Sequence, residues 1–379
     1  MSDVRSFGWI AVWSGLVAGC LPEGAGPSGA GTPDEAEAPV PFVGTHCPDW
    51  GCGANSPTLV DGVAFDELDA AGAPDRDGIQ IVSAFQGSVP VMLHVDRHTL
   101  SATATDGSGK GFTHGALVGT IVTLKKAGVV YGIRIDSVDE NSLKFWAGDT
   151  SEVVPFYRIL VRAPGEQEFK NPVCRANVAS TEKIWVGVEH SAIAFAGDRY
   201  EPAQKLVADE NRAKTWFNLA CAGSATAKLH LMRHTNAGAW TAATWQPGSD
   251  VRAPSAPFHT DVLQRQAMLK MFAADYCGTG QPFTVDGQPL LYEDSRHWFA
   301  PWTIGVDALS VAADGTVSPP GSTMEALWTD QRALCVSWPR LVDRNTVPCL
   351  VSGEVPPCTP DLTASWDSLV HVISVNPPL

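Results

Sequence analysis

The chain has 379 residues, of which 44% are hydrophobic and 18% are charged, and its formal net charge at pH 7 is -15. The length suffices for two or three domains, and the composition is that of a folded protein with a buried core. An acidic surface repels phosphate backbones, and no block of Lys and Arg offsets the excess of acid, so nucleic acid is excluded as an expected partner.

The first twenty residues have the organisation of an export signal. Residues 7–17 are apolar, and this stretch is shorter than the ~18 residues that a membrane-spanning helix needs. It ends in Leu16-Val17-Ala18-Gly19-Cys20, which resembles the lipobox of bacterial lipoproteins. We therefore expect a lipoprotein signal peptide over residues 1–19 and lipidation of Cys20, which attaches the chain to a membrane without a span. An ordinary signal peptide that contains a cysteine, or a buried apolar helix, is the alternative.

The segment after Cys20 has the composition of a tether. Residues 20–46 are rich in Gly, Pro, Ala and Glu, so we expect a flexible coil with a span of ~25–30 Å. Leu21 stands where the familiar sorting rule has Asp for retention in the inner membrane. By that analogy the anchored protein is expected in the cell envelope, at the outer membrane, and its exposure to the periplasm or to the surface is left open.

Short runs rich in β-branched residues begin near residue 79. In residues 129–136 apolar and other residues alternate, as in a strand with one buried face. The pattern predicts a β-rich N-terminal domain over residues 47–165, antiparallel from about residue 79 onwards. The expected strands cover residues 79–82, 89–93, 117–124, 128–135 and 157–161.

The second half, residues 166–379, is expected to be a mixed domain. Its clearest helix starts at Thr260 or Asp261, either of which is a good N-cap, and ends near Ala274. Residues 202–214 also have helical composition, while residues 322–338 predict strand-turn-strand. Further strands are expected at residues 183–188, 191–195 and 370–375. The predicted fold class is thus β-rich and mixed α+β, with an antiparallel β domain followed by a domain with one clear helix.

Nine cysteines are present, and eight are left for pairing if Cys20 carries lipid. Export places these eight in an oxidising compartment where disulfides persist, although their connectivity cannot be deduced from sequence. The spacing of Cys47 and Cys52 would also suit a zinc finger, but no second close pair follows, so a disulfide is preferred. The disulfide candidates are Cys47, Cys52, Cys174, Cys221, Cys277, Cys335, Cys349 and Cys358.

The tetrad Ala274-Asp275-Tyr276-Cys277 resembles the signature of the ADYC domain, which is found in exported proteins and lipoproteins of Gram-negative bacteria. Flanking features are similar too, and together they extend over roughly residues 110–350. They are a β region at 116–135, a Cys-containing strand at 218–228, a Thr-x-Asp-Gly turn at 283–287 and a later Cys strand at 325–336. Leu229 stands where the family tends to have a second Cys, so its disulfide pattern is not carried over whole. The resemblance implies architecture and location, not an activity.

Four carboxylates near the tetrad are candidate catalytic residues: Asp275, Asp286, Glu293 and Asp294. Two carboxylates held ~5–9 Å apart can perform general acid and base catalysis. The structural alternative, which we prefer, is a corner in which Cys277 forms a disulfide, Tyr276 is packed and Asp275 accepts hydrogen bonds from the backbone of the next loop.

Other motifs give no metal or cofactor prediction. The pairs His94/His98 and His230/His234 have the i, i+4 spacing of a metal site on a helix, but both lie in segments that we expect to be strand or turn. Residues 75–78 resemble part of a calcium loop, yet the later acidic ligand is missing and a turn is preferred. No cofactor and no metal is therefore predicted.

The sequence thus predicts an exported, lipid-anchored, disulfide-stabilised protein with a binding or structural role at the cell envelope. A protein or a glycan is the candidate ligand, since the chain holds 13 Trp and exposed Trp can stack on sugars or bind a partner; packing in or around the core is the preferred role of these tryptophans. The alternative is an extracytoplasmic hydrolase that uses the carboxylates around Asp275 and Asp286. A calcium-dependent adhesin is a third, weaker hypothesis.

Overall fold

The computed structural model describes most of the chain after residue 56. The described residues are 57–60, 62–141, 144–145, 152–174, 190–201, 206–208, 215–237, 261–283, 291–294, 316–317, 322–340, 343–359 and 372–376. The predictions for residues 1–46, Cys47, Cys52, Asp286 and the strand at 183–188 lie outside these residues.

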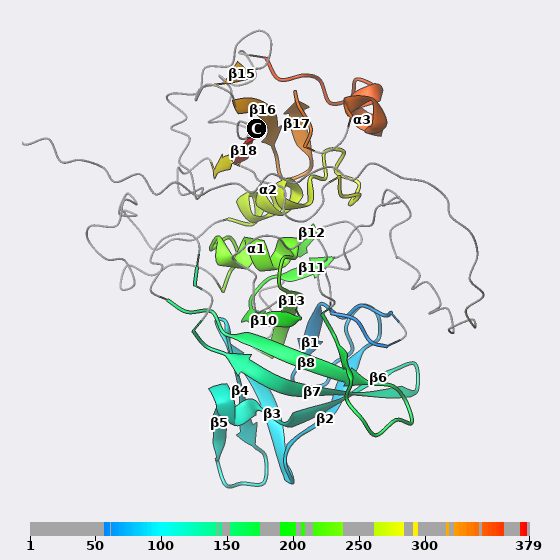
Figure 1. Ribbon diagram of the computed structural model, residues 1–379, viewed down its shortest axis with the longest axis vertical. Helices are drawn as coiled ribbons and strands as arrows, with labels where there is room; N and C mark the ends of the chain where they lie inside the picture. The colour runs from blue at the N-terminus through cyan, green and yellow to red at the C-terminus, as the bar shows by residue number, and fades with distance from the viewer. Residues whose placement is uncertain are drawn as a thin grey trace, which may run out of the picture. The chain divides into compact units, whose positions relative to one another are not determined.

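Most of the described strands belong to one antiparallel sheet with the order β1-β13-β10-β8-β7-β6-β2-β3-β4-β5, and β9 pairs with β8 (Figure 1). A short 3-10 helix, η1 (His114–Leu117), follows β5. The strands are β1 (Glu67–Asp69), β2 (Gln80–Gln86), β3 (Val89–Asp96), β4 (Thr99–Ala104), β5 (Gly111–Thr113), β6 (Thr120–Lys126), β7 (Val129–Asp139), β8 (Phe156–Arg162), β9 (Asn171–Pro172), β10 (Ser191–Ala196) and β13 (Trp216–Cys221).

The sheet curves so that strands distant in its order touch. Leu100 of β4 donates its N–H to the Tyr157 hydroxyl of β8 at 2.8 Å, and Ala196 of β10 donates its N–H to the Arg97 carbonyl at 2.8 Å. The enclosed face buries the sheet core, whose residues include Leu93, Leu100, Leu124, Ile133, Ile159 and Phe217. Alternating apolar residues, as expected from sequence, point into this core.

Strands β8, β10 and β13 also contribute to a second core, because their other faces are covered. In β10, Ala192 and Ala194 point into the sheet core, whereas Ile193 and Phe195 point into what we call the helix core. The helix core includes Phe156, Ile193, Phe195, Leu229, Met268 and Trp328. A strand buried on both faces reads as a continuous apolar run, which explains the composition of residues 191–195.

Three of the described helices contribute to the helix core: α1 (Ala225–Leu231), α2 (Val262–Ala273) and α3 (Pro348–Val351), the last through Cys349 and Leu350. Ser224 caps α1 through the N–H of Ala227, and Asp261 caps α2 through the N–H of Gln264, which confirms the predicted helix and its N-cap. Because α2 contacts α1 and β12 (Leu206–Ala208) as well as β16 (Ser322–Trp328) and β18 (Val372–Asn376), most of its surface is buried and no single apolar stripe is needed.

A second antiparallel sheet has the order β14-β18-β16-β15, and β17 pairs with β16. The expected strand-turn-strand at 322–338 is confirmed as β16 and β17, and the expected C-terminal strand as β18. The remaining elements are β11 (Arg199–Glu201), β12 (Leu206–Ala208), β14 (Leu291–Asp294), β15 (Thr316–Val317), β16 (Ser322–Trp328), β17 (Ala333–Val336), η4 (Arg344–Thr346), α3 (Pro348–Val351) and β18 (Val372–Asn376).

The helical expectation for residues 202–214 is wrong at residues 206–208, which form β12. This segment pairs with β11 in the register Tyr200 to Val207, and the N–H of Val207 donates to the side chain of Gln266 in α2. Backbone pairing and a buried side-chain acceptor therefore override the local composition.

Within the described residues, three disulfides connect six of the eight candidate cysteines. They are Cys174–Cys221, Cys277–Cys349 and Cys335–Cys358. Strands β9, β10 and β13 follow residue 165 yet belong to the same sheet as β1 to β8. The domain limits of 47–165 and 166–379 stay a prediction. Among the described helices, none is both long and apolar enough to cross a membrane.

Candidate functional site

The tetrad lies directly after α2, in a tight reversal that we call the Asp275 corner (residues 274–280). Ala274 ends the helix in the left-handed conformation, with φ 49 and ψ 41. Its N–H donates to Met271 O, and the N–H of Asp275 donates to Lys270 O, both at 2.9 Å. Glycine is the usual residue at such a helix end, because a side chain there costs ~1–2 kcal/mol. The surrounding contacts must therefore hold Ala274 in place.

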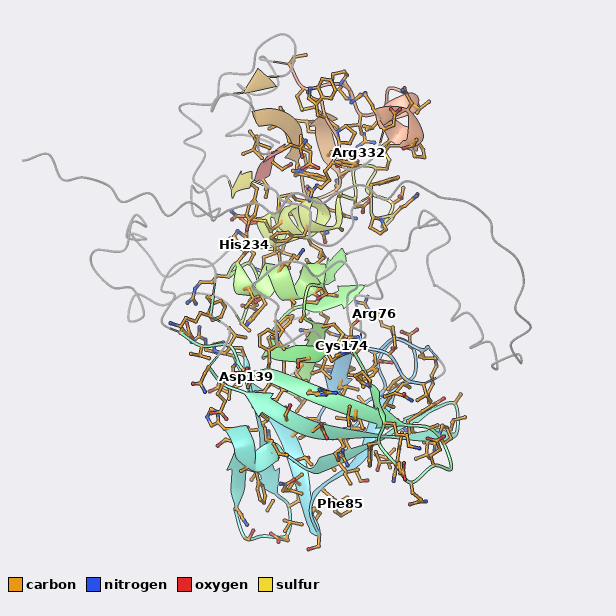
Figure 2. All side chains as sticks on the ribbon, viewed as in Figure 1. Arg76, Phe85, Asp139, Cys174, His234 and Arg332 are labelled. Atoms are coloured by element: carbon orange, nitrogen blue, oxygen red, sulfur yellow. A yellow bond between two sulfur atoms is a disulfide. The ribbon has the colours of Figure 1, made fainter. Side chains whose placement is uncertain are left out.

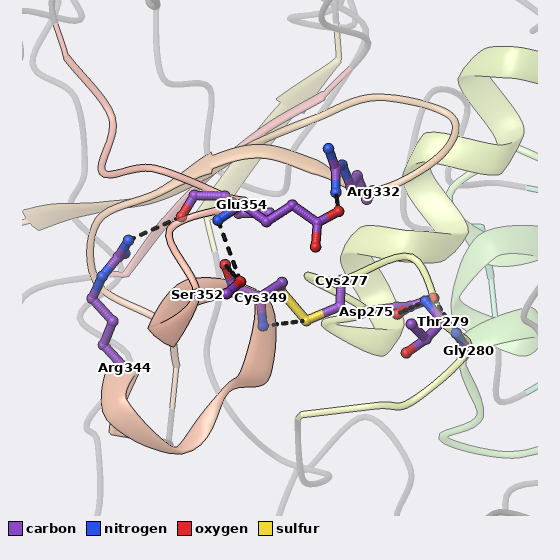
Figure 3. Close-up of a disulfide and its surroundings, with 10 residues drawn as sticks. Asp275, Cys277, Thr279, Gly280, Arg332, Arg344, Cys349, Ser352 and Glu354 are labelled. Carbon is purple, nitrogen blue, oxygen red and sulfur yellow. Dashed lines mark hydrogen bonds and ion pairs between the residues drawn. A yellow bond between two sulfur atoms is a disulfide. The ribbon is translucent and has the colours of Figure 1, made fainter.

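Asp275 is fully buried, and hydrogen bonds occupy both of its carboxylate oxygens (Figure 3). Oδ2 accepts from Lys270 Nζ at 2.6 Å and from the N–H of Gly280 at 2.9 Å. Oδ1 accepts from the N–H of Thr279 at 3.0 Å. Since Lys270 is buried as well, the carboxylate neutralises an internal charge and closes the loop that follows the helix.

Tyr276 joins the corner to the second sheet through its hydroxyl. The hydroxyl donates to Glu325 Oε1 at 2.6 Å and accepts from the N–H of Arg340 at 2.9 Å. Arg340 in turn binds both oxygens of Glu325 and donates to Met271 O at 2.9 Å. Burial, followed by the charge of Glu325, raises the pKa of Tyr276 well above its ordinary value, so the phenol stays a donor.

The ring of Tyr276 packs as tightly as its hydroxyl. It stacks on Trp328 of β16 with ring centroids 5.3 Å apart and an interplanar angle of 22°. The indole N–H of Trp328 donates to Ser374 Oγ of β18 at 2.7 Å. The end of α2 is thereby connected to two strands of the second sheet.

Cys277 and Gly278 complete the corner. Cys277 forms a disulfide with Cys349 at the start of α3, as Figure 3 shows. Gly278 has φ +71, and a Cβ there would overlap Gln331 O and lie 2.9 Å from Arg332 Cβ. Only glycine fits this conformation and this approach of the backbone.

The described contacts of Asp275 include none of the other predicted catalytic residues. Glu293 and Asp294 lie in β14, where their backbones pair with Ile373 and Val372 of β18. Asp286 lies outside the described residues. The hydrolase alternative requires accessible carboxylates, whereas Asp275 has no exposed surface.

A second polar cluster, which sequence analysis missed, surrounds Glu152. We call it the Glu152 hub, and it contains Arg97, His98, Glu152, His230 and Arg233. Glu152 accepts from Arg97 Nη1 at 2.7 Å and from Arg233 Nη2 at 2.8 Å. His98 Nε2 lies 3.7 Å from Glu152 Oε1. Both arginines have positive φ, 51 and 59 respectively, so the backbone is strained where they meet the carboxylate.

Aromatic rings enclose the hub. The ring of His230 stacks on Phe195 at a centroid distance of 4.6 Å, and its Nδ1 is 2.8 Å from Thr235 Oγ1. The guanidinium of Arg233 lies 3.8 Å from the centroid of the Phe145 ring. The members come from three distant segments, and the histidine pairs noted in the sequence did not point to Arg97, Glu152 or Arg233.

Burial sets the protonation states in the hub. Desolvation, helped by Arg97 and Arg233 and opposed by Glu152, lowers the pKa of His98 to about 4. Desolvation also lowers the pKa of His230 well below its ordinary value. Desolvation alone would raise the pKa of Glu152. The interactions with Arg233, Arg97 and His98 outweigh it, so the pKa is lowered. At neutral pH the hub therefore contains two neutral histidines and an ionised carboxylate.

The histidine pairs do not form metal sites in the described residues. His230 lies on α1, so the expectation of strand or turn was wrong there, but His234 comes after the helix has ended at Leu231. No group of three or more His, Cys, Asp or Glu that could hold a metal occurs in the described residues. At residues 75–78 the preferred turn is present, since Asp75 Oδ1 accepts from the N–H groups of Asp77 and Ile79.

Comparison with known proteins agrees with the geometry of the corner. The family model of the ADYC domain matches residues 114–342, which include α1, α2 and the Asp275 corner. No curated protein and no solved structure matches the chain. The match covers more than half of the 379 residues. The chain belongs to the ADYC domain family.

Proposed function

We propose that this chain is an exported protein, anchored by a lipid on Cys20 to the cell envelope at the outer membrane, whose ADYC domain has a binding or structural role. The observation that carries the non-catalytic part is the burial of Asp275, whose carboxylate is saturated by Lys270, Thr279 and Gly280. A carboxylate without exposed surface cannot reach a substrate, so the signature residues stabilise the fold.

The disulfides support the export part of the proposal. Three bridges connect Cys174–Cys221, Cys277–Cys349 and Cys335–Cys358. Disulfides form and persist in the periplasm and outside the cell and are rare in the bacterial cytosol. The lipobox-like sequence that ends at Cys20 accounts for export and membrane attachment in one signal.

Acyl labelling tests the anchor. The full chain is expressed in a Gram-negative host with an alkyne analogue of palmitate, and the membrane fraction is analysed by intact mass. The wild type and the control Cys47→Ser should be labelled and membrane-bound, whereas Cys20→Ser should lose the label and leave the membrane fraction. Label that persists in Cys20→Ser, or an unprocessed and reduced wild type in the cytosol, would contradict the anchor.

The substitution Asp275→Asn tests the non-catalytic role. It leaves the buried charge of Lys270 uncompensated, which should cost about 3–5 kcal/mol of unfolding free energy. Urea unfolding measures this loss, and the wild type is assayed in parallel with ester, peptide and glycoside substrates. A variant that keeps wild-type stability but abolishes a measurable hydrolysis would favour the hydrolase.

A further inference from the structure

A cavity of about 410 Å³ lies beside the C-terminal end of β7. Polar side chains from β7, from the turn after it, from β8 and from the start of β10 line it. Those that matter here are Ser137, Asp139, Asn141, Arg158, His190 and Ser191. The volume falls within the ~300–1,000 Å³ of small-molecule sites, and no motif in the sequence pointed to it.

A β-bulge in β7 builds this site. Ile135 pairs with Ile159 and Ser137 pairs with Arg158, so Asp136 is the extra residue. The bulge shifts the alternation of β7 by one residue, because side chains of a regular strand alternate between faces. Ser137 and Asp139 thereby lie on the same face as Arg158.

Three neighbouring strands then present a row of polar groups. Ser137 of β7 pairs with Arg158 of β8, and Arg158 pairs with Ser191 of β10. Phe156, two residues before Arg158 and on the same face, is buried in the helix core. The cavity therefore begins at the edge of the helix core, where apolar packing on this face of β8 gives way to polar side chains.

Contacts within the protein position the polar groups that line the cavity. The side chain of Arg158 is 47% exposed, and its Nε lies 4.0 Å from Asp136 Oδ2. His190 is held through Nδ1, which lies 3.2 Å from Cys174 O. Asp139, labelled in Figure 2, lies at the end of β7, and its Oδ1 accepts from the N–H of Asn141 at 2.9 Å. An arginine oriented by a carboxylate loses less entropy on binding than a free one.

The lining selects one class of ligand. Seven of the nine lining residues are polar, which disfavours an apolar ligand. Asp139 and Glu140 repel an anion, and Arg158 repels a cation. A ligand with many uncharged hydroxyl groups satisfies both sets, because carboxylates and Asn141 accept from hydroxyls while Arg158 donates to adjacent hydroxyl oxygens. We infer that this cavity binds a neutral saccharide of one or two rings.

This inference rests on the proposed binding role and names its ligand class. Saturation-transfer NMR tests it, with glucose, galactose, mannose, N-acetylglucosamine, cellobiose and diacetylchitobiose as probes on the full chain without its signal peptide. At least one probe should bind the wild type saturably. Arg158→Ala and the isosteric Asp139→Asn should each lower its affinity at least tenfold, while the exposed control Arg76→Ala should keep it.

Thermal unfolding of each variant checks that it is folded at the temperature of the binding measurement, so that lost binding is not lost folding. The inference is overturned if no probe binds saturably, or if Arg158→Ala and Asp139→Asn bind as the wild type does. The acyl labelling of Cys20 is measured separately. A wild type that is acylated but binds no saccharide contradicts only the saccharide inference. A wild type without the acyl group contradicts only the proposed anchor.

Discussion

Two buried tyrosines allow the contribution of one hydroxyl to the unfolding free energy to be measured. The Tyr276 hydroxyl contacts Glu325 and Arg340, as described above, whereas the Tyr200 hydroxyl is buried without a hydrogen-bond partner among the described residues. Both rings lie in the helix core, so their apolar surroundings are comparable. The two residues therefore form a matched pair for measuring the polar network of the corner.

We expect Tyr276→Phe to lower the unfolding free energy by about 1–3 kcal/mol, because Glu325 and the Arg340 N–H lose a buried partner. Tyr200→Phe should not lower it, because the Tyr200 hydroxyl has no buried partner to lose in the described part of the chain. Urea unfolding at pH 7 measures both. Equal losses in the two variants would mean that ring packing, not the hydroxyl network, stabilises the corner.

Alanine substitutions at Gly278 and Gly353 distinguish the stability cost of a steric clash from that of backbone strain. Both have positive φ, +71 and +77, but a Cβ on Gly353 meets nothing within 4 Å. Gly353→Ala should therefore cost only about 1–2 kcal/mol for the left-handed backbone, and Gly278→Ala should cost clearly more because its Cβ meets Gln331 O. Thermal unfolding compares them, and similar losses would remove the steric argument.

At the scale of elements, the Glu152 hub connects parts of the chain that are far apart in sequence. Arg97 and His98 are in the turn between β3 and β4, His230 is in α1, and Arg233 follows α1. The Glu152 hub is therefore a second connection between the sheet core and the helix core, in addition to β10. Its histidines are neutral in the folded protein, which makes stability depend on pH.

We expect acid to destabilise the fold before the carboxylates of the surface titrate. The pKa of His98 is about 4 in the folded state and ~6.5 in the unfolded state, so between these values the unfolded chain binds the proton. The unfolding free energy is therefore not reduced by His98 above pH ~6.5. It falls by about 2 kcal/mol as the pH drops from there towards 4. The lowered pKa of Glu152 adds a loss at still lower pH. Urea midpoints at pH 7, 5.5 and 4 measure this dependence.

His98→Gln should flatten the dependence between pH 6.5 and 4. His94→Gln is the control, since His94 lies in β3 outside the hub and should leave the slope as in the wild type. If both variants keep the wild-type slope, the acid sensitivity originates elsewhere.

At the scale of the whole molecule, the disulfides constrain the unfolded chain over different lengths. The sequence separations are 72 for Cys277–Cys349, 47 for Cys174–Cys221 and 23 for Cys335–Cys358. In the chain-entropy description a longer loop gives more stabilisation, although the increase is slow. The chain therefore provides a graded series within one protein.

Removing each bridge by a double Cys→Ala substitution should cost about 3–5 kcal/mol, and the cost should decrease in the order of the three separations. The first and last should differ by about 1 kcal/mol. Urea unfolding of the three variants under oxidising conditions measures this order. A reversed order would show that packing around the sulfurs, not loop length, decides the cost.

Local signals were sufficient where one segment determines its own structure. The helix at 262–273 was predicted from the two N-cap candidates Thr260 and Asp261, of which Asp261 is the cap, and β7 from its alternation up to the bulge at Asp136. Residues 206–208 were misassigned, because hairpin pairing of β12 with β11 and the distant acceptor on Gln266 override the helical composition. The cavity beside β7 was missed because Ser137, Arg158 and Ser191 are neighbours only through strand register.

The amino-acid order by itself determined the β-rich class, the family signature at residues 274–277 and the cysteines available for bridges. These follow from side-chain periodicity and residue identity, which are properties of the chain alone. Tertiary structure decided which cysteines pair, that Lys270 is the partner of Asp275, and that Glu152 gathers Arg97 and Arg233. Such contacts join positions up to 81 residues apart, and only the packing of the finished fold brings them within bonding distance.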